Sequence, residues 1–318
     1  MQYTKTAKHL FYGLLFFLSV FLSGCVAHNG GGEFEPLPDI ARKTELTTVP
    51  FFDQGDDLCG PASISMLLNY QGEALTPQAL EPLIYIPGKK GALQAEMLAV
   101  TRRHEFIPYI IRPDLTALVQ EVNAGNPVLI LQNLAFSWYP RWHYAVVVGY
   151  DLDRDTFILR SGITERLEMP RRRFFRHWRG SSHWGMVALR ADKIPQTAEM
   201  NQYLATVASL ERLGQWDSVT AAYETAAKKW PRSDIARLGA GNGHYRRGNK
   251  KKARDYYSMA INLNPDSAIA HNNLAQTLYD LGQIERAREH ALEAIALGGP
   301  ATSTFRQTLE QINSARSR

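Results

Sequence analysis

Cys59 is the residue whose surroundings most clearly predict chemistry. It begins the sequence Cys-Gly-Pro-Ala, and proline suits the first turn of a helix because its missing N–H is not needed there. The backbone N–H groups at a helix N-terminus stabilise a thiolate and lower the pKa of a thiol. A cysteine in this position is therefore a candidate nucleophile.

The residues after Cys59 predict the helix that would position it. Apolar side chains recur at Ile64, Leu67 and Leu68, which is the spacing of one helical face. Gln71-Gly72 then supplies the residues that end such a helix. The thiol is thus expected at the N-terminus of a helix of about three turns, with buried apolar residues behind it.

His143 is the best candidate for a general base among the nine histidines. A thiol nucleophile needs an imidazole nearby to take its proton and to protonate the leaving amine. His143 precedes Tyr-Ala-Val-Val-Val-Gly-Tyr, a run of β-branched and aromatic residues typical of a buried strand. A rigid strand would hold the imidazole in place.

These residues together resemble the bacteriocin-processing (double-glycine leader) cysteine peptidases and their papain-like relatives. In that family a glutamine lies five residues before a Cys-Gly-Pro-Ala motif, and a later histidine opens a valine-rich strand; Gln54, Cys59 and His143 fit this pattern. The resemblance implies an α+β papain-like domain with Cys59 as nucleophile. It also implies that the Gln54 amide and the Cys59 backbone N–H form an oxyanion hole, in which one donor contributes on the order of 3 kcal/mol.

Ser161 occupies the position where this family usually carries an aspartate that orients the histidine. It follows a predicted second strand, residues 156–160, that pairs back on the strand of His143. A serine can accept a hydrogen bond from the imidazole, but it cannot offset imidazolium charge as a carboxylate does. Two interpretations stay open, an orienting residue and a serine that caps the end of the strand.

Trp138 and Trp142 lie just before His143 and are candidates for lining a substrate cleft. The alternative is that they pack in the core, as aromatic residues beside a strand often do. No metal-ligand pattern and no cofactor motif accompanies these residues, so we expect neither a metal nor an organic cofactor.

The N-terminal residues predict export and lipidation. Two lysines precede an apolar run over residues 10–22, which is shorter than a membrane-spanning helix and typical of a signal peptide. The run ends in Leu-Ser-Gly-Cys, which resembles the lipobox of bacterial lipoproteins, with Cys25 as the acylated residue. If Cys25 carries lipid, no second cysteine remains for a disulfide with Cys59, which again indicates a reactive thiol.

The expected organisation has four parts. Residues 1–24 form the lipoprotein signal peptide, residues 25–45 a flexible tether rich in glycine and proline, residues 46–192 the peptidase domain and residues 198–318 a repeat domain. Val26 after the lipidated cysteine favours the outer membrane, so the protein is expected to face the periplasm of a bacterial envelope.

The repeat domain follows from a period of 34 residues. Gly214, Gly248 and Gly282 keep that spacing, as do Pro231 and Pro265. This is the period of the tetratricopeptide repeat, a pair of helices. Three units, 200–233, 234–267 and 268–301, are expected to stack as an all-α solenoid, with residues 302–318 as a capping helix.

Composition narrows the function classes. The formal net charge is +5 and no nucleic-acid motif is present, so nucleic acid is not an expected partner. The sequence favours a lipid-anchored cysteine peptidase whose repeats recruit a peptide or protein. Two alternatives remain: a non-catalytic peptide-binding adaptor, and a cell-wall amidase or acyl transferase with the same Cys-His chemistry.

Overall fold

The computed structural model describes residues 40–55, 58–89 and 91–316. The predicted signal peptide and the lipidation site Cys25 lie outside these residues. Within the described part of the chain, no helix is both long enough and apolar enough to cross a bilayer.

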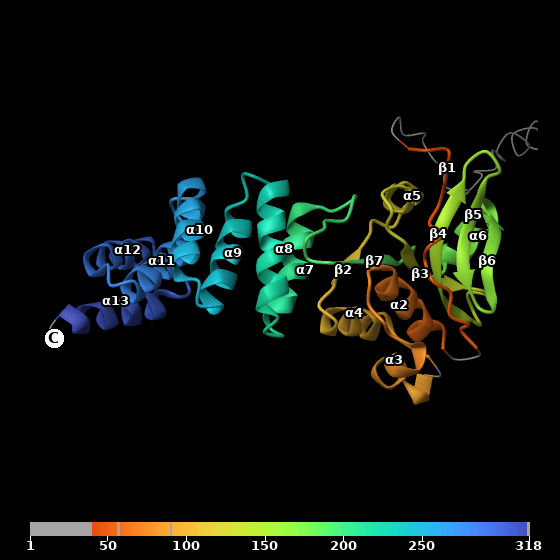
Figure 1. Ribbon diagram of the computed structural model, residues 1–318, viewed down its shortest axis with the longest axis horizontal. Helices are drawn as coiled ribbons and strands as arrows, with labels where there is room; N and C mark the ends of the chain where they lie inside the picture. Colours follow the sequence, from red (N-terminus) through yellow and green to blue (C-terminus); the bar gives the residue numbers. More distant parts are fainter. Residues whose placement is uncertain (1–39, 56–57, 90, 317–318) are drawn as a thin grey trace, which may run out of the picture. The chain divides into compact units, whose positions relative to one another are not determined.

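The first domain is built on a seven-stranded antiparallel sheet, in the order β2-β7-β3-β4-β5-β6, with β1 paired to β4 (Figure 1). The strands are β1 (Lys43–Glu45), β2 (Ile107–Ile110), β3 (Val128–Asn133), β4 (Trp142–Asp151), β5 (Thr156–Ser161), β6 (Thr164–Pro170) and β7 (Gly185–Leu189). The predicted strands after His143 and at residues 156–160 are both present, as β4 and β5.

Helices cover both faces of the sheet. One face packs against α2 (Cys59–Tyr70), α3 (Pro77–Ile84) and α4 (Gln94–Arg103), which lie together in Figure 1, and a short 3-10 helix, η1 (Pro87–Lys89), links α3 to α4. The other face packs against α5 (Leu115–Asn123) and α6 (Arg171–Arg179). The expected α+β class of this domain is confirmed.

β1 corrects the predicted extent of the tether. Residues 25–45 were expected to be flexible, but Lys43–Glu45 pairs with Asp151–Gly149 of β4. Gly149 allows this pairing, because a Cβ built there would lie 2.6 Å from the Thr44 carbonyl oxygen. The folded domain therefore begins at least three residues earlier than predicted.

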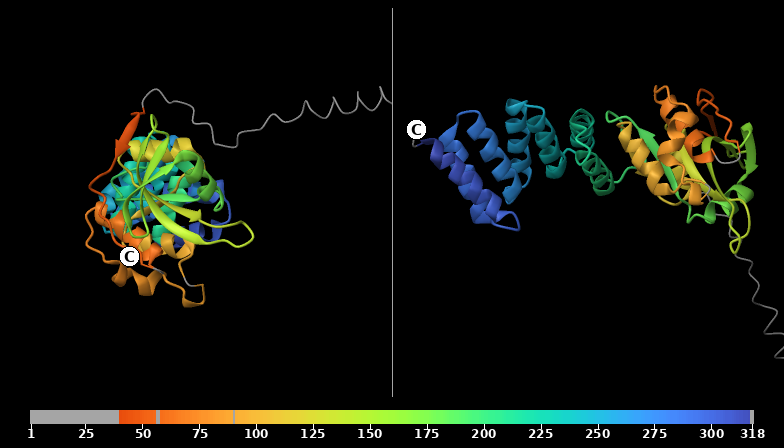
Figure 2. Two further views of the ribbon diagram at one scale, coloured as in Figure 1. Left: turned by 90° about the vertical axis from the view of Figure 1, so that its right-hand side faces the viewer. Right: turned by 90° about the horizontal axis from the view of Figure 1, so that it is seen from below.

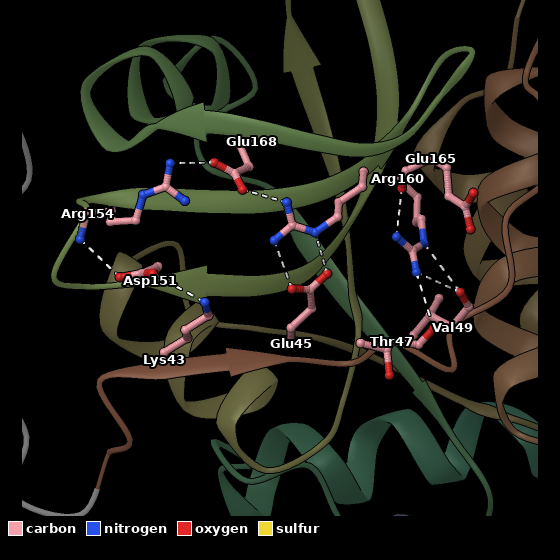
Figure 3. Close-up of polar contacts among 10 residues, drawn as sticks. Lys43, Glu45, Thr47, Val49, Asp151, Arg154, Arg160, Glu165 and Glu168 are labelled. Carbon is pink, nitrogen blue, oxygen red and sulfur yellow. Dashed lines mark hydrogen bonds and ion pairs between the residues drawn. The ribbon is translucent and has the colours of Figure 1, made fainter.

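Arginines hold the N-terminal segment onto the sheet. Arg166 on β6 makes a two-pronged contact with the Glu45 carboxylate, at 2.8 and 3.0 Å. The guanidinium of Arg160 is buried and donates to the carbonyl oxygens of Val49 and Glu165 (Figure 3). These contacts fix the chain just before Gln54 and Cys59.

The second domain is a stack of helical pairs. Its helices are α7 (Met200–Glu211), α8 (Trp216–Lys229), α9 (Asp234–Arg246), α10 (Lys250–Leu263), α11 (Ala268–Asp280), α12 (Ile284–Leu297) and α13 (Thr302–Arg316). Each predicted unit contains one pair, and α13 covers the last pair as expected. The glycines of the 34-residue period have positive φ, +71° at Gly214 and +77° at Gly248, a backbone conformation that favours glycine.

The first helical pair shares its core with the peptidase domain. One apolar cluster runs from Val187 and Leu189 of β7 to Tyr203 and Val207 of α7. The link between the domains is fixed by Glu121, whose buried carboxylate accepts hydrogen bonds from the backbone N–H groups of Gln196 and Thr197, the Thr197 hydroxyl and the Asn126 amide. The two domains therefore meet through a packed core.

We predict that Glu121→Gln destabilises the protein by about 2–4 kcal/mol, because a neutral amide cannot accept all four hydrogen bonds and leaves buried donors unsatisfied. The free energy of unfolding from urea titration measures this effect. The control is Glu165→Gln, whose side chain is exposed, and which is expected to change stability by less than about 0.5 kcal/mol. Equal stability of the Glu121 variant and the wild type would contradict this role.

Candidate active site

Cys59 is the first residue of α2, as the sequence predicts. Its N-cap residue is Leu58, whose side chain makes no capping hydrogen bond to the helix. Gly60 explains how the end of α2 is fixed, since a Cβ there would lie 2.8 Å from the Ala92 Cβ. This close approach presses the thiol-bearing turn against the loop that leads into α4.

Cys59 and His143 line the same cleft. Its volume is about 810 Å³, and its walls come from the start of α2, residues 91–94, the start of β4, the turn after β5 and residues 180–182. His143 lies at the start of β4, where the predicted strand begins. The structure thus brings the predicted nucleophile and the predicted base to one cavity.

Ser161 contacts the imidazole of His143. Its Oγ lies 2.9 Å from the Nε2 atom of His143, and it is the last residue of β5. The geometry favours the first of the two open interpretations, a serine that orients the imidazole. With Nε2 directed at Ser161, Nδ1 is the ring nitrogen left to receive a proton from another group.

The environment of His143 disfavours its charged form. Burial of the imidazole, together with the positive charge of Arg141, lowers its pKa from the ordinary 6.5 to about 4. Among the described residues that line the cleft, Arg141 is the one with a permanent charge, and none carries a carboxylate. The imidazole is therefore neutral over most of the physiological pH range.

Gln54 connects two segments of the site through hydrogen bonds that the sequence does not indicate. Its side chain is buried; the Oε1 atom accepts a hydrogen bond of 2.6 Å from the Gly162 N–H, and the Nε2 atom donates to the Ser63 hydroxyl at 3.1 Å. The Gln54 backbone N–H also donates to the Gly162 carbonyl oxygen. One Nε2 hydrogen remains beyond these contacts, so its role in an oxyanion hole stays a prediction.

The two tryptophans differ in position. Trp142 lines the cleft and is 49% exposed. Trp138 is 79% exposed, lies in the β3–β4 connection and is not among the residues that line the cleft. The prediction that both line a substrate cleft is therefore wrong for Trp138, whose ring instead stacks on Phe136 in the exposed connection.

Sequence reasoning missed two neighbours of the thiol and imidazole. Arg141, two residues before His143, lines the cleft and gives the cleft a positive charge. Tyr144 also lines it, and the pKa of its hydroxyl is raised by burial and by the negative charge of a Cys59 thiolate. Both lie within two residues of His143 in the sequence, and this proximity is the signal that could have indicated them.

No group of three or more histidine, cysteine, aspartate or glutamate residues that could hold a metal ion occurs in the described part of the chain. The reactive groups that line the cleft are a thiol, an imidazole and a serine hydroxyl. This set can support attack of sulfur on a carbonyl carbon with the imidazole as proton acceptor.

Comparisons with known protein families identify both domains of the chain. Residues 46–186 match the peptidase C39-like family, and residues 241–282 match the TPR repeat. No curated protein matches the chain.

Solved structures match each domain at low identity. A Bacillus anthracis protein described as C39-like peptidase is 18% identical, with a TM-score of 0.40 over 48% of this chain and 98% of its own. The first TPR of Spaghetti (RPAP3), solved with an HSP90 peptide, is 16% identical, with a TM-score of 0.34 over 36% and 90%. The Yersinia enterocolitica translocator chaperone SycD is 15% identical, with a TM-score of 0.36 over 37% and 86%. The two family matches identify residues 46–186 as a peptidase C39-like domain, which tetratricopeptide repeats follow.

Proposed function

We propose that this protein is a cysteine peptidase that hydrolyses peptide bonds with Cys59 as nucleophile and His143 as general base. The observation that carries the proposal is the shared cleft of Cys59 and His143, with the Ser161 hydroxyl 2.9 Å from the imidazole Nε2 atom. The match of residues 46–186 to the peptidase C39-like family supports the same reaction class.

The low pKa of His143 defines how the reaction begins. A neutral imidazole accepts the thiol proton as the sulfur attacks the substrate carbonyl, and the resulting imidazolium then protonates the leaving amine. The N-terminal N–H groups of α2 stabilise negative charge beside Cys59. Water finally cleaves the thioester, with His143 again accepting a proton.

The repeats are proposed to recruit the substrate or a partner protein. A groove of about 400 Å³ in this domain is lined by amide, hydroxyl and aromatic side chains, including Trp216, Asn242, Asn273 and Thr304. Amide side chains can bond the backbone of an extended peptide whatever its sequence. Arg246 stacks on Trp216, with its guanidinium 5.5 Å from the ring centre, and adds a positive charge to this groove, while Glu211 adds a carboxylate.

The location proposed for the protein is the bacterial envelope, with a lipid anchor at Cys25 and the peptidase domain facing the periplasm. The Leu-Ser-Gly-Cys sequence after an apolar run supports the anchor. Two or more acyl chains give stable membrane attachment, whereas one chain gives only marginal binding.

A non-catalytic adaptor is the second candidate, and two observations favour it. Ser161 replaces the family's usual aspartate, and no carboxylate lines the described part of the cleft. Without that charge an imidazolium is poorly stabilised. An adaptor would bind peptides in the cleft and use the repeats for assembly.

We predict that Cys59→Ala and His143→Ala each lower kcat/KM for peptide hydrolysis by at least about 10³-fold, because either change removes a step of proton or acyl transfer. Product analysis of peptide and muropeptide mixtures measures the activity and its bond class. His104→Ala, away from the cleft, is the matched control and should retain wild-type activity. Cleavage of muropeptides alone would assign the site to cell-wall amides. The adaptor function would instead be supported by three results together: the wild type binds peptides, it cleaves neither mixture, and its thiol reacts with iodoacetamide no faster than that of the His143→Ala variant.

The pKa of His143 predicts a low acid limit for activity. The catalytic form is the neutral imidazole, so activity should be lost only as the pH falls through about 4, not through 6.5. An NMR titration of the His143 ring and the pH profile of kcat/KM both measure this midpoint. Arg141→Gln removes the nearby positive charge and should move the midpoint to higher pH. An unchanged midpoint in this variant would exclude Arg141 as a cause.

Ser161 variants separate orientation from charge. Ser161→Ala should lower kcat about fivefold, because it removes one hydrogen bond worth roughly 1 kcal/mol. Ser161→Asp places a carboxylate beside the imidazole and should raise the pKa of His143 and the acid limit of activity. Asn201→Asp adds the same charge at an exposed site on α7 and should leave the pH profile unchanged. Identical profiles for the two aspartate variants would contradict a direct Ser161–His143 contact.

A further inference from the structure

The β3–β4 connection carries an exposed aromatic cluster that the proposed reaction does not use. Phe136, Trp138 and Tyr139, here called the aromatic tip, are 67%, 79% and 71% exposed. The rings of Phe136 and Trp138 stack with centroids 5.6 Å apart, and Trp138 contacts Tyr139. Contiguous exposed aromatic side chains of this kind mark an interaction surface.

The aromatic tip is held rigidly. The Asn133 side chain closes the base of the connection: its Oδ1 atom accepts hydrogen bonds from the N–H groups of Ala135 and Arg141, at 3.0 and 2.9 Å. Its Nδ2 atom donates to the Phe136 carbonyl oxygen, and the Leu134 N–H donates to the Arg141 carbonyl oxygen. The rings are thus presented to solvent without a large cost in conformational freedom on binding.

The C-terminal end of a strongly basic helix, α6, lies beside the base of the tip. The end of α6 abuts Asn133, since a Cβ built at Gly180 would lie 2.5 Å from the Asn133 Cβ. Helix α6 contains five arginines and no acidic residue. Four of these arginines are exposed and form no ion pair within the described part of the chain: Arg172, Arg173, Arg176 and Arg179.

The positive charge of α6 contributes to the lowered pKa values of two neighbouring histidines. Burial, followed by the charges of Arg173 and Arg176, lowers the pKa of His177. Burial and then the charge of Arg179 lowers the pKa of His183. Residues 134–141 add Arg141 and contain no acidic residue. This part of the surface therefore has a positive potential that attracts anions.

We propose that the aromatic tip and α6 together form a membrane-docking surface for a bilayer that contains anionic lipids. Aromatic side chains favour the boundary between lipid headgroups and acyl chains, and arginines beside them pair with anionic headgroups. The β3–β4 connection extends outward from the sheet, as the yellow loop in the left view of Figure 2 shows. Peptide sites are grooves and clefts, so this shape favours a planar partner over an extended peptide.

The proposed anchor can reach this surface. Lys43 pairs with Asp151, at the opposite end of β4 from Trp142, and this strand spans roughly 30 Å. The 18 residues from Cys25 to Lys43 (43 − 25) can extend to roughly 60 Å. A lipid on Cys25 and the aromatic tip can therefore occupy the same bilayer.

Docking would bring the cleft close to the lipid surface. Leu134, Arg141 and Trp142 lie on either side of the tip in the sequence, and all three line the cleft. A peptidase bound in this way would act on polypeptide segments near the membrane. The docking itself does not depend on the cysteine chemistry.

Fluorescence quenching tests the docking in the full-length chain. The chain is bound to phosphatidylcholine–phosphatidylglycerol vesicles whose acyl chains carry bromine, which quenches tryptophans that enter the bilayer. None of the six tryptophans lies in residues 1–39, so the N-terminal segment contributes no signal. We expect quenching in the wild type that is lost in Trp138→Phe. The double variant Phe136→Ser, Tyr139→Ser keeps Trp138 as the reporter and should also lose the quenching.

Matched variants control for general effects. Ile235→Ser with Ile269→Ser removes two apolar side chains that are each 52% exposed in the repeats, and quenching should remain. Replacing Arg172, Arg173 and Arg176 by glutamine should lower the docking equilibrium constant by roughly 100-fold on anionic vesicles. Replacing Lys228 and Lys229, exposed in the repeats, should have little effect.

Two results would overturn the proposal. The first is an absence of quenching in the wild type, or equal quenching in the wild type and the tip variants. The second is a pair of findings: the tip variants no longer bind soluble peptides in the absence of vesicles, and their tryptophan quenching by vesicles is unchanged. These findings would assign the tip to peptide recognition. Neither result bears on whether Cys59 is catalytic, which the hydrolysis assay decides separately.

Discussion

The buried amide of Gln54 joins the two halves of the site, and their geometry depends on it. It links Ser63, in the second turn of α2, to Gly162, in the turn after β5. Ser161, the neighbour of Gly162, contacts His143. A chain of hydrogen bonds thus runs from the helix that carries the thiol to the strand that carries the imidazole. A buried network of this kind fixes geometry only when each member has its partners.

The replacement of a carboxylate by Ser161 changes the energetics of the site more than its shape. The hydroxyl can fix the direction of the imidazole, but burial and Arg141 lower the pKa of His143 to about 4. A stable thiolate–imidazolium pair requires the imidazolium to be favoured. The site is therefore suited to proton transfer during attack by sulfur, not to a preformed ion pair. An anionic substrate group near Arg141 would reduce this penalty.

The helix and strand that carry Cys59 and His143 could be predicted from sequence patterns among neighbouring residues. The features that were not predicted depend on pairing between segments that lie far apart in the sequence. The helix after Cys59, the strand after His143 and the 34-residue period each depend on neighbouring residues. Strand β2 was missed because Pro108 interrupts the strand pattern. An edge strand tolerates proline, and β2 lies at the edge of the described sheet, next to β7. Strand β1 is three residues long, and its pairing with β4 leaves no periodicity to detect. The second role of Gln54 depends on Gly162, which lies 108 residues away.

The repeats are joined to the peptidase domain by packing, and this limits how they can serve it. The apolar cluster of the sheet continues into α7, α8 and α9, and the Gln215 side chain donates a hydrogen bond to the Arg102 carbonyl oxygen of α4. A flexible linker would let a recruited protein sample many positions and would raise only its local concentration. A shared core instead fixes the first repeat relative to the sheet, so a segment bound by the repeats would enter the cleft from a restricted set of directions. The proposed recruitment by these repeats would therefore select substrates by geometry as well as by affinity.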